Sequence, residues 1–126
     1  MTFNVRDMPH ALVSTILDNE FGIATRNGCF CAHPYLVHLL GIEDGMDALR
    51  QRVRDGATTH EPDFPGAARA TIGIYNTREE VDRFVEALDI IASGDHSGDY
   101  VWSEAAGWQC RGCRTVNVPP ETLWVS

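Results

Sequence analysis

Two pairs of cysteines carry the most reactive side chains of this sequence. Cys29 and Cys31 lie one residue apart in the stretch NGCFCAHP, near His33 and just after a turn, whereas Cys110 and Cys113 form a CRGC motif towards the C-terminal end. The first pair is compatible with half of a metal site, with a reactive nucleophile, or with an ordinary bend carrying two small apolar side chains. Each interpretation predicts a different class of protein.

A zinc site would combine all four cysteines. Four thiolates at tetrahedral distance close a structural site, and CRGC has knuckle spacing with a glycine turn. The Cys29–Cys31 pair is a less typical half-site, and its distance in sequence from Cys110 is long for a compact zinc module. CRGC could instead be redox active, although it does not open a helix as redox CxxC pairs do, or it could be incidental to the tail. The residues leave these alternatives open.

A nucleophilic cysteine needs a partly exposed thiol that ionises readily. Cys31 is predicted to lie on a turn near Arg26 and close to a helix that begins at about Pro34, whose dipole favours a thiolate. Phe30 is expected to point to the opposite side, and Cys29 could be the cysteine that packs. A loop cysteine can also be purely structural, so the spacing identifies Cys31 as a candidate only.

The composition limits the classes of function. A chain of 126 residues that is 44% hydrophobic has room for one domain with one core. The net charge of −8 argues against a nucleic-acid partner, and no apolar run approaches the length of a membrane span. Because four cysteines occur without an export signal, we expect a cytoplasmic protein with reduced thiols. We expect neither a membrane nor a nucleic acid among its partners.

Hydrophobic periodicity and turn residues predict an alternation of short strands and helices. Ala70, Ile72 and Ile74 should share one face of a strand, and a Thr77–Glu80 capping box should begin the last helix. That helix should turn its apolar side chains inward, namely Val81, Phe84, Val85, Leu88 and Ile91. The expected elements are strands over 2–5, 22–25 and 68–76, helices over 9–19, 34–41, 43–56 and from 77, and a hairpin or wrapping arm after Tyr100.

This order predicts an α+β fold, a small sandwich of an antiparallel or mixed sheet with helices packed on one face. The charged helix over 43–56 should lie on the surface, because its apolar face is narrow. The strand over 2–5 begins almost at the first residue, and we therefore expect the chain to be part of something longer.

Two motifs in the same order resemble the C-terminal small domain of class V aminotransferases. They are GIATRNGCFCAHP and ARATIGIYNTREEVDRFVEAL. The family reads Gly-Ile-Ala-x-Arg-x-Gly-x-x-Cys-Ala-x-Pro, then Arg-Ala-Ser/Thr-x-x-x-Tyr-Asn-Thr, then a capped helix, and the likeness is greatest to the cysteine desulfurase and selenocysteine lyase branch. We expect a small domain over 1–93 with an insert at about 41–66, followed by a C-terminal tail or wrapping arm over 94–126.

The resemblance implies roles for three residues. Cys31 matches the loop cysteine that attacks the sulfur or selenium of the substrate and holds it as a persulfide. Arg69 matches the arginine that binds the α-carboxylate of the substrate, a task suited to a planar guanidinium because it can donate two parallel hydrogen bonds. Arg26 matches an arginine near the active site. The implied substrate is an amino acid such as cysteine, and the family's active sites lie near a dimer interface, which makes a homodimer possible.

The implied cofactor is pyridoxal 5′-phosphate, held as a Schiff base to a lysine of a large domain. All ten basic residues of this chain are arginine. We therefore expect the chain alone to bind no cofactor, to hold no metal and to be inactive, and to partner the large domain of the same protein. The alternative is a free-standing sulfur carrier or a zinc-stabilised binding module without catalysis of its own.

Overall fold

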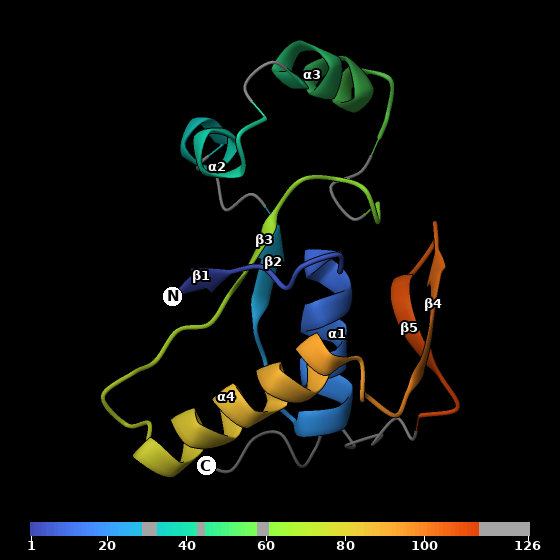
Figure 1. The fold of residues 1–126 in the computed structure, drawn as a ribbon. Helices are drawn as coiled ribbons and strands as arrows, with labels where there is room; N and C mark the ends of the chain where they lie inside the picture. The colour runs from blue at the N-terminus through green and yellow to red at the C-terminus, as the bar shows by residue number, and fades with distance from the viewer. Residues whose placement is uncertain (29–32, 43–44, 58–60, 114–126) are drawn as a thin grey trace, which may run out of the picture.

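A computed structural model describes residues 1–28, 33–42, 45–57 and 61–113 of the chain (Figure 1). Two small antiparallel sheets are combined with helices, which confirms the predicted α+β class. The elements in chain order are β1 (Thr2–Phe3), α1 (His10–Phe21), β2 (Arg26–Gly28), α2 (His33–Leu40), α3 (Met46–Arg54), β3 (Ala67–Arg69), α4 (Arg78–Ser93), β4 (Asp99–Ser103) and β5 (Gly107–Arg111).

The first sheet has the strand order β1-β3-β2, and both outer strands run antiparallel to β3. Ala68 in the centre lies opposite Phe3 on one side and Asn27 on the other. Because directly paired residues share a face, these three form one row. The Phe3 ring meets Phe84 of α4 edge to face, with centroids 5.7 Å apart. The helices α1 and α4 therefore cover the Phe3 face of the sheet.

Helix α1 supplies the centre of the core. Its side chains Val13, Ile16 and Leu17 are fully buried, as the apolar stripe over the predicted helix requires. The helix ends at Gly22, whose φ of 65° is the left-handed conformation that glycine adopts without steric cost.

Helix α4 begins as predicted. The Thr77 hydroxyl accepts a hydrogen bond from the backbone N–H of Glu80, and the Glu80 carboxylate accepts one from the backbone N–H of Thr77. Phe84 and Ile91 are buried, whereas the prediction for Val85 is wrong, because its side chain is half exposed. The inward stripe passes through Ala87 instead, which is buried and allows the helix to approach the core closely.

Three strand predictions are shifted or too long. The strand expected over 2–5 ends at Phe3. The strand expected over 22–25 lies at Arg26–Gly28, because only those residues face the paired segment of β3. The strand expected over 68–76 ends at Arg69. Beyond it the chain turns, and the backbone N–H of Gly73 donates to Oδ1 of Asn76 at 2.8 Å. A strand continues only where a neighbouring strand supplies hydrogen-bond partners. Because β1 and β2 pair with three residues of β3 at most, β3 is short.

The segment between β2 and β3 forms a separate helical layer at one end of the sheet (Figure 1). Helix α2 is followed by Gly41, which has a φ of 65°. Helix α3 has no buried residue, which confirms the predicted surface position of the charged helix.

The second sheet is the hairpin of β4 and β5, with Trp102 opposite Trp108 and Tyr100 opposite Cys110. It lies beside α1 (Figure 1), and Tyr100 packs against the main core. A hairpin was one of the two forms predicted for the tail. Among the helices of the described ranges, none has both the length and the apolar character needed to cross a bilayer.

Candidate functional site

Two of the three predicted site residues lie side by side in the first sheet. Arg26 of β2 is the direct partner of Arg69 of β3, and Thr2 of β1 pairs with Arg69 from the other side. Side chains of successive strand residues point to opposite faces. The row Thr2–Arg69–Arg26 therefore lies on the face away from Phe3, Ala68 and the two core helices.

The neighbouring residues explain why the arginines occupy this face. Ala67 and Ala68 are almost completely buried, so the small side chains of β3 fill the tightly packed positions of the sheet. Arg69 follows them at the end of the strand and is half-buried, while Arg26 at the start of β2 is exposed. Side-chain size thus places the two guanidinium groups at one end of the β2–β3 pair, on the face away from α1 and α4.

Two like charges directly opposite each other in a sheet repel. An anion bound between them would remove that repulsion, and a carboxylate matches the planar fork of a guanidinium. The pair Arg26–Arg69 can therefore serve as a carboxylate site.

Cys31, the predicted nucleophile, lies outside the described residues, as does Cys29. Their segment joins the end of β2 at Gly28 to the start of α2 at His33. In the sequence, Cys31 thus follows the strand that carries Arg26.

A groove of about 270 Å³ opens between the end of α1, the segment after β3 and the start of α4. Ile23, Ile72 and Phe84 give it an apolar wall. At its polar end the Glu80 carboxylate has a pKa held below its ordinary value by the backbone N–H of Thr77 and by the amide of Asn76.

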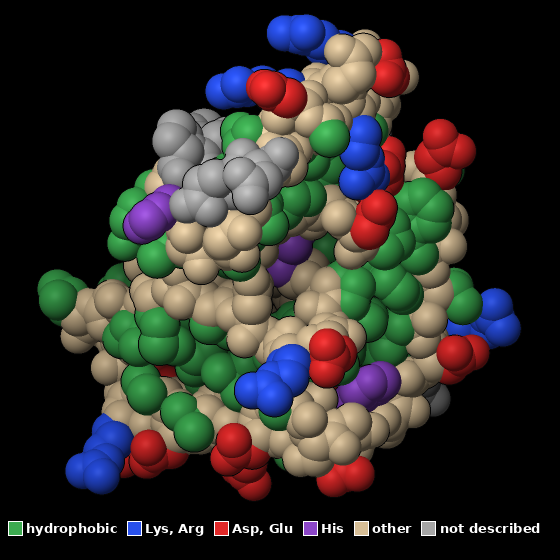
Figure 2. All heavy atoms as spheres, turned by 45° about the horizontal axis from the view of Figure 1, so that its top comes forward, with side chains coloured by type: hydrophobic (Ala, Val, Ile, Leu, Met, Phe, Trp, Pro, Cys, Tyr) green, Lys and Arg blue, Asp and Glu red, His purple; other side chains and the backbone are tan. Residues whose placement is uncertain are grey.

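Large apolar side chains beside this groove face solvent. Ile72 and Tyr75 are mostly exposed, and Ile74 is completely exposed. In the space-filling view, hydrophobic side chains gather in patches at the surface (Figure 2). Adjacent exposed hydrophobic residues of this size indicate a surface that another protein segment covers.

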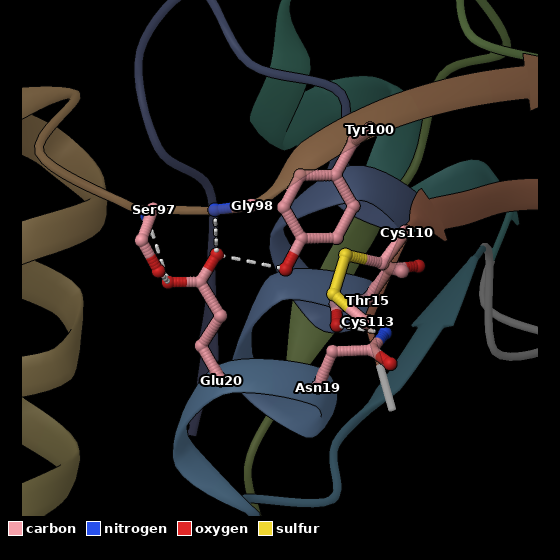
Figure 3. Close-up of a disulfide and its surroundings, with 8 residues drawn as sticks. All are labelled: Thr15, Asn19, Glu20, Ser97, Gly98, Tyr100, Cys110 and Cys113. Carbon is pink, nitrogen blue, oxygen red and sulfur yellow. Dashed lines mark hydrogen bonds between the residues drawn. A yellow bond between two sulfur atoms is a disulfide. The ribbon is translucent and has the colours of Figure 1, made fainter. Parts of the chain in front are cut away.

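The residue that anchors the hairpin, Glu20, was missed by the sequence reasoning. Its carboxylate accepts hydrogen bonds from the backbone N–H groups of Ser97 and Gly98, both at 2.9 Å, and from the hydroxyl of Tyr100 at 2.9 Å (Figure 3). Burial raises the pKa of Glu20, but these hydrogen bonds outweigh it and lower the pKa overall. Burial and the Glu20 carboxylate raise the pKa of Tyr100 well above its usual value. A lone acid near a helix end gives no signal for such a role.

The cysteines of the CRGC motif form a disulfide, Cys110–Cys113 (Figure 3). The expectation of reduced thiols is wrong for this pair. Bonded sulfurs are not thiolate ligands, so the four-cysteine zinc site is not formed in this state. In the part of the chain that the structure describes, His, Cys, Asp and Glu side chains form no cluster able to hold a metal ion.

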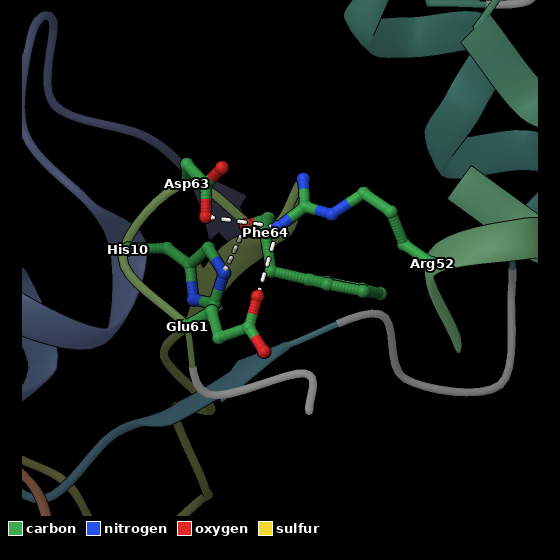
Figure 4. Close-up of polar contacts among 5 residues, drawn as sticks. All are labelled: His10, Arg52, Glu61, Asp63 and Phe64. Carbon is green, nitrogen blue, oxygen red and sulfur yellow. Dashed lines mark hydrogen bonds and ion pairs between the residues drawn. The ribbon is translucent and has the colours of Figure 1, made fainter. Parts of the chain in front are cut away.

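A second polar cluster, also missed, fixes the segment before β3 (Figure 4). Arg52 of α3 bridges Glu61 at 2.8 Å and Asp63 at 3.1 Å. The bond from Arg52 holds the pKa of Asp63 below its ordinary value. Next to it, Nε2 of the buried His10 lies 3.1 Å from the carbonyl oxygen of the buried Phe64. These contacts connect α3 to the start of α1.

Comparison with known proteins agrees with the two sequence motifs. Residues 1–84 match the family described as Aminotransferase class-V. The chain therefore belongs to the class V aminotransferase family, which confirms the resemblance seen in the sequence.

Three similar relatives share the description probable cysteine desulfurase. A probable cysteine desulfurase of Methanothermobacter thermautotrophicus is 34% identical over 92 residues, which are 73% of this chain and 18% of the relative. Probable cysteine desulfurases of Staphylococcus epidermidis and Halalkalibacterium halodurans are 34% and 30% identical over 70% and 71% of this chain, and 16% of each relative. The chain thus spans less than a fifth of the length of these relatives. No solved structure gives a significant match.

Proposed function

We propose that residues 1–93 are the C-terminal small domain of a cytoplasmic, pyridoxal 5′-phosphate-dependent enzyme of the cysteine desulfurase or selenocysteine lyase type. Residues 94–126 form its C-terminal arm. The observation that supports this most directly is the pairing of Arg26 with Arg69 on the face of the sheet away from α1 and α4. The similarity to probable cysteine desulfurases supports the reaction type.

In this proposal the arginine pair binds the α-carboxylate of cysteine or a related amino acid. Arg69 is half-buried and donates the two parallel hydrogen bonds, while Arg26 adds a second positive charge beside it. Hydrogen bonds to charged groups contribute about 1.5–3 kcal/mol each. Such a site fixes the amino acid at one end and leaves its side chain free to reach a nucleophile.

Cys31 is the proposed nucleophile. Its thiolate would attack the substrate sulfur, form a persulfide and leave the remaining carbon skeleton to the rest of the enzyme. The position of Cys31 in the sequence, between the strand that carries Arg26 and helix α2, supports this assignment.

The residues of this chain do not fit the covalent attachment of the cofactor. A Schiff base to the protein needs a side-chain amine, and the sequence contains no lysine. We therefore assign cofactor binding to a large domain of the same enzyme. The exposed residues Ile72, Ile74 and Tyr75 are the proposed surface against that domain. The homodimer stays a prediction from the resemblance.

The test is to isolate the native polypeptide with an antibody against this chain, and to assay it with cysteine and pyridoxal phosphate for sulfide and alanine. We expect a polypeptide much larger than 14.0 kDa that forms both products. A native polypeptide of 14.0 kDa without activity would instead favour the free-standing sulfur carrier. Sulfide formation from cysteine and pyridoxal phosphate by the 126-residue chain alone would also contradict the proposal.

Variants of the active enzyme test the residues. Arg69→Lys keeps the charge but loses the two parallel hydrogen bonds, so KM for cysteine should rise about tenfold to a hundredfold. Cys31→Ser should abolish sulfur release. Arg78→Lys, an exposed arginine on α4, is the matched control and should leave KM unchanged.

A further inference from the structure

The Cys110–Cys113 disulfide joins two residues of one turn rather than two elements of the fold. Their Cα atoms are 5.5 Å apart, and Gly112, with a φ of 83°, returns the chain towards the end of β5. Stabilisation by a cross-link grows with the length of the loop that it closes, and these cysteines are three positions apart. The bond therefore constrains the unfolded chain very little.

The hairpin does not depend on this bond for its attachment. Its strands pair from Asp99–Arg111 to Ser103–Gly107, and Glu20 holds the segment before β4 through Ser97, Gly98 and Tyr100. A disulfide that the fold does not need can be reduced and re-formed while the hairpin stays folded.

The surroundings of the disulfide suit thiol exchange. Both cysteines are half-buried, so neither sulfur is sealed in the core. Tyr100 pairs with Cys110 across the hairpin and lies beside the disulfide (Figure 3).

We propose that Cys110 and Cys113 form a redox couple that takes sulfur from a persulfide and releases it as sulfide. One thiolate attacks the outer sulfur of the persulfide R–S–SH, the original S–S bond breaks, and R–S⁻ leaves with the bonding electron pair. The second thiolate then attacks the cysteine sulfur of the new persulfide and expels hydrosulfide.

The reaction balances as R–S–SH plus two thiols giving R–SH, H₂S and the disulfide. The outer sulfur gains two electrons and the two cysteines lose them. A low-molecular-weight thiol of the cell reduces the disulfide and resets the couple. This inference rests on the proposed function in one respect, because the persulfide on Cys31 would be the natural donor.

The test uses the 126-residue chain with Cys29→Ser and Cys31→Ser, so that only the CRGC pair can react. The chain is reduced with a dithiol, freed of it, and mixed with cysteine hydropersulfide. We expect about one equivalent of sulfide per chain, and an intact mass lower by two hydrogens as the disulfide forms. Further substitution of Cys110→Ser or Cys113→Ser should stop the reaction at a persulfide on the remaining cysteine, with a mass gain of one sulfur atom.

Equal sulfide release by the reduced chain and by a chain that also lacks Cys110 and Cys113 would overturn the proposal. A large fall in thermal stability on reduction would also overturn it, because the bond would then be a structural cross-link. Circular dichroism of each variant checks that the hairpin remains folded. Since this chain lacks Cys31, its result is independent of the desulfuration assay, and either proposal can fail alone.

Discussion

Arg26 lies directly opposite Arg69 across the β2–β3 pair, with both side chains on the face away from α1 and α4. Like charges directly opposite each other destabilise a sheet. A substrate carboxylate bound between the two guanidinium groups, as proposed above, would offset this repulsion.

The first prediction follows from this repulsion. Arg26→Gln should raise the free energy of unfolding of the 126-residue chain by a few tenths of a kcal/mol in urea titrations. Arg78→Gln on the exposed side of α4 is the control and should give no gain. A clear loss of stability in Arg26→Gln would show that Arg26 has a structural role.

The second prediction concerns the anchor of the hairpin. Glu20→Gln removes the charge that receives the hydrogen bonds of Ser97, Gly98 and Tyr100. It should lower the free energy of unfolding by about 1–2 kcal/mol, measured in urea. The near-ultraviolet signal of Trp102 and Trp108 should change with it, because they lie on the hairpin. Asp18→Asn, an exposed carboxylate on the same helix, should change neither.

The third prediction is a dependence on pH. The pKa of Glu20 is lower in the folded chain than its ordinary value of 4.5. Its contribution is therefore fully present above pH 4.5 and is lost as the pH falls through the folded pKa. Because Glu80 and Asp63 also have lowered pKa values, the difference between wild type and Glu20→Gln isolates the effect. That difference should shrink on acidification, and a constant difference would contradict the assignment.

The fourth prediction tests the capping box of α4. Thr77→Ala removes the hydroxyl that accepts from the backbone N–H of Glu80 and should cost about 1 kcal/mol of stability. Ser93→Ala at the opposite end of the helix is the comparison, because its hydroxyl donates to the Asp89 carbonyl without capping the first turn. Urea unfolding followed by circular dichroism gives both values.

The fifth prediction concerns the exposed segment after β3. Ile74 is fully exposed, so Ile74→Ser should leave the stability of the chain unchanged within about 0.5 kcal/mol. In the complete enzyme the same change should weaken the fit to the proposed large domain and reduce activity. Val85→Ser, at a half-exposed apolar position on α4, is the comparison. It removes apolar area at a different place on the surface, so it separates an effect of the Ile74 site from a general loss of apolar area.

The sequence by itself determined the elements whose signals are local. The Thr77–Glu80 capping box depends on hydrogen bonds within a few residues, and it was predicted correctly. The apolar stripe of α1 also follows from its own periodicity. Two family motifs in matching order were sufficient to identify the class V aminotransferase family.

Only the tertiary structure decided which residues face each other. β3 ends at Arg69, and Ile74 faces solvent, because strand length depends on partners that are distant in sequence. For the same reason, no local pattern predicts that Arg26 pairs with Arg69 or that Glu20 binds a segment more than seventy residues away. Sheet register and buried hydrogen bonds between distant segments are set by how the whole chain packs, and the candidate site depends on both.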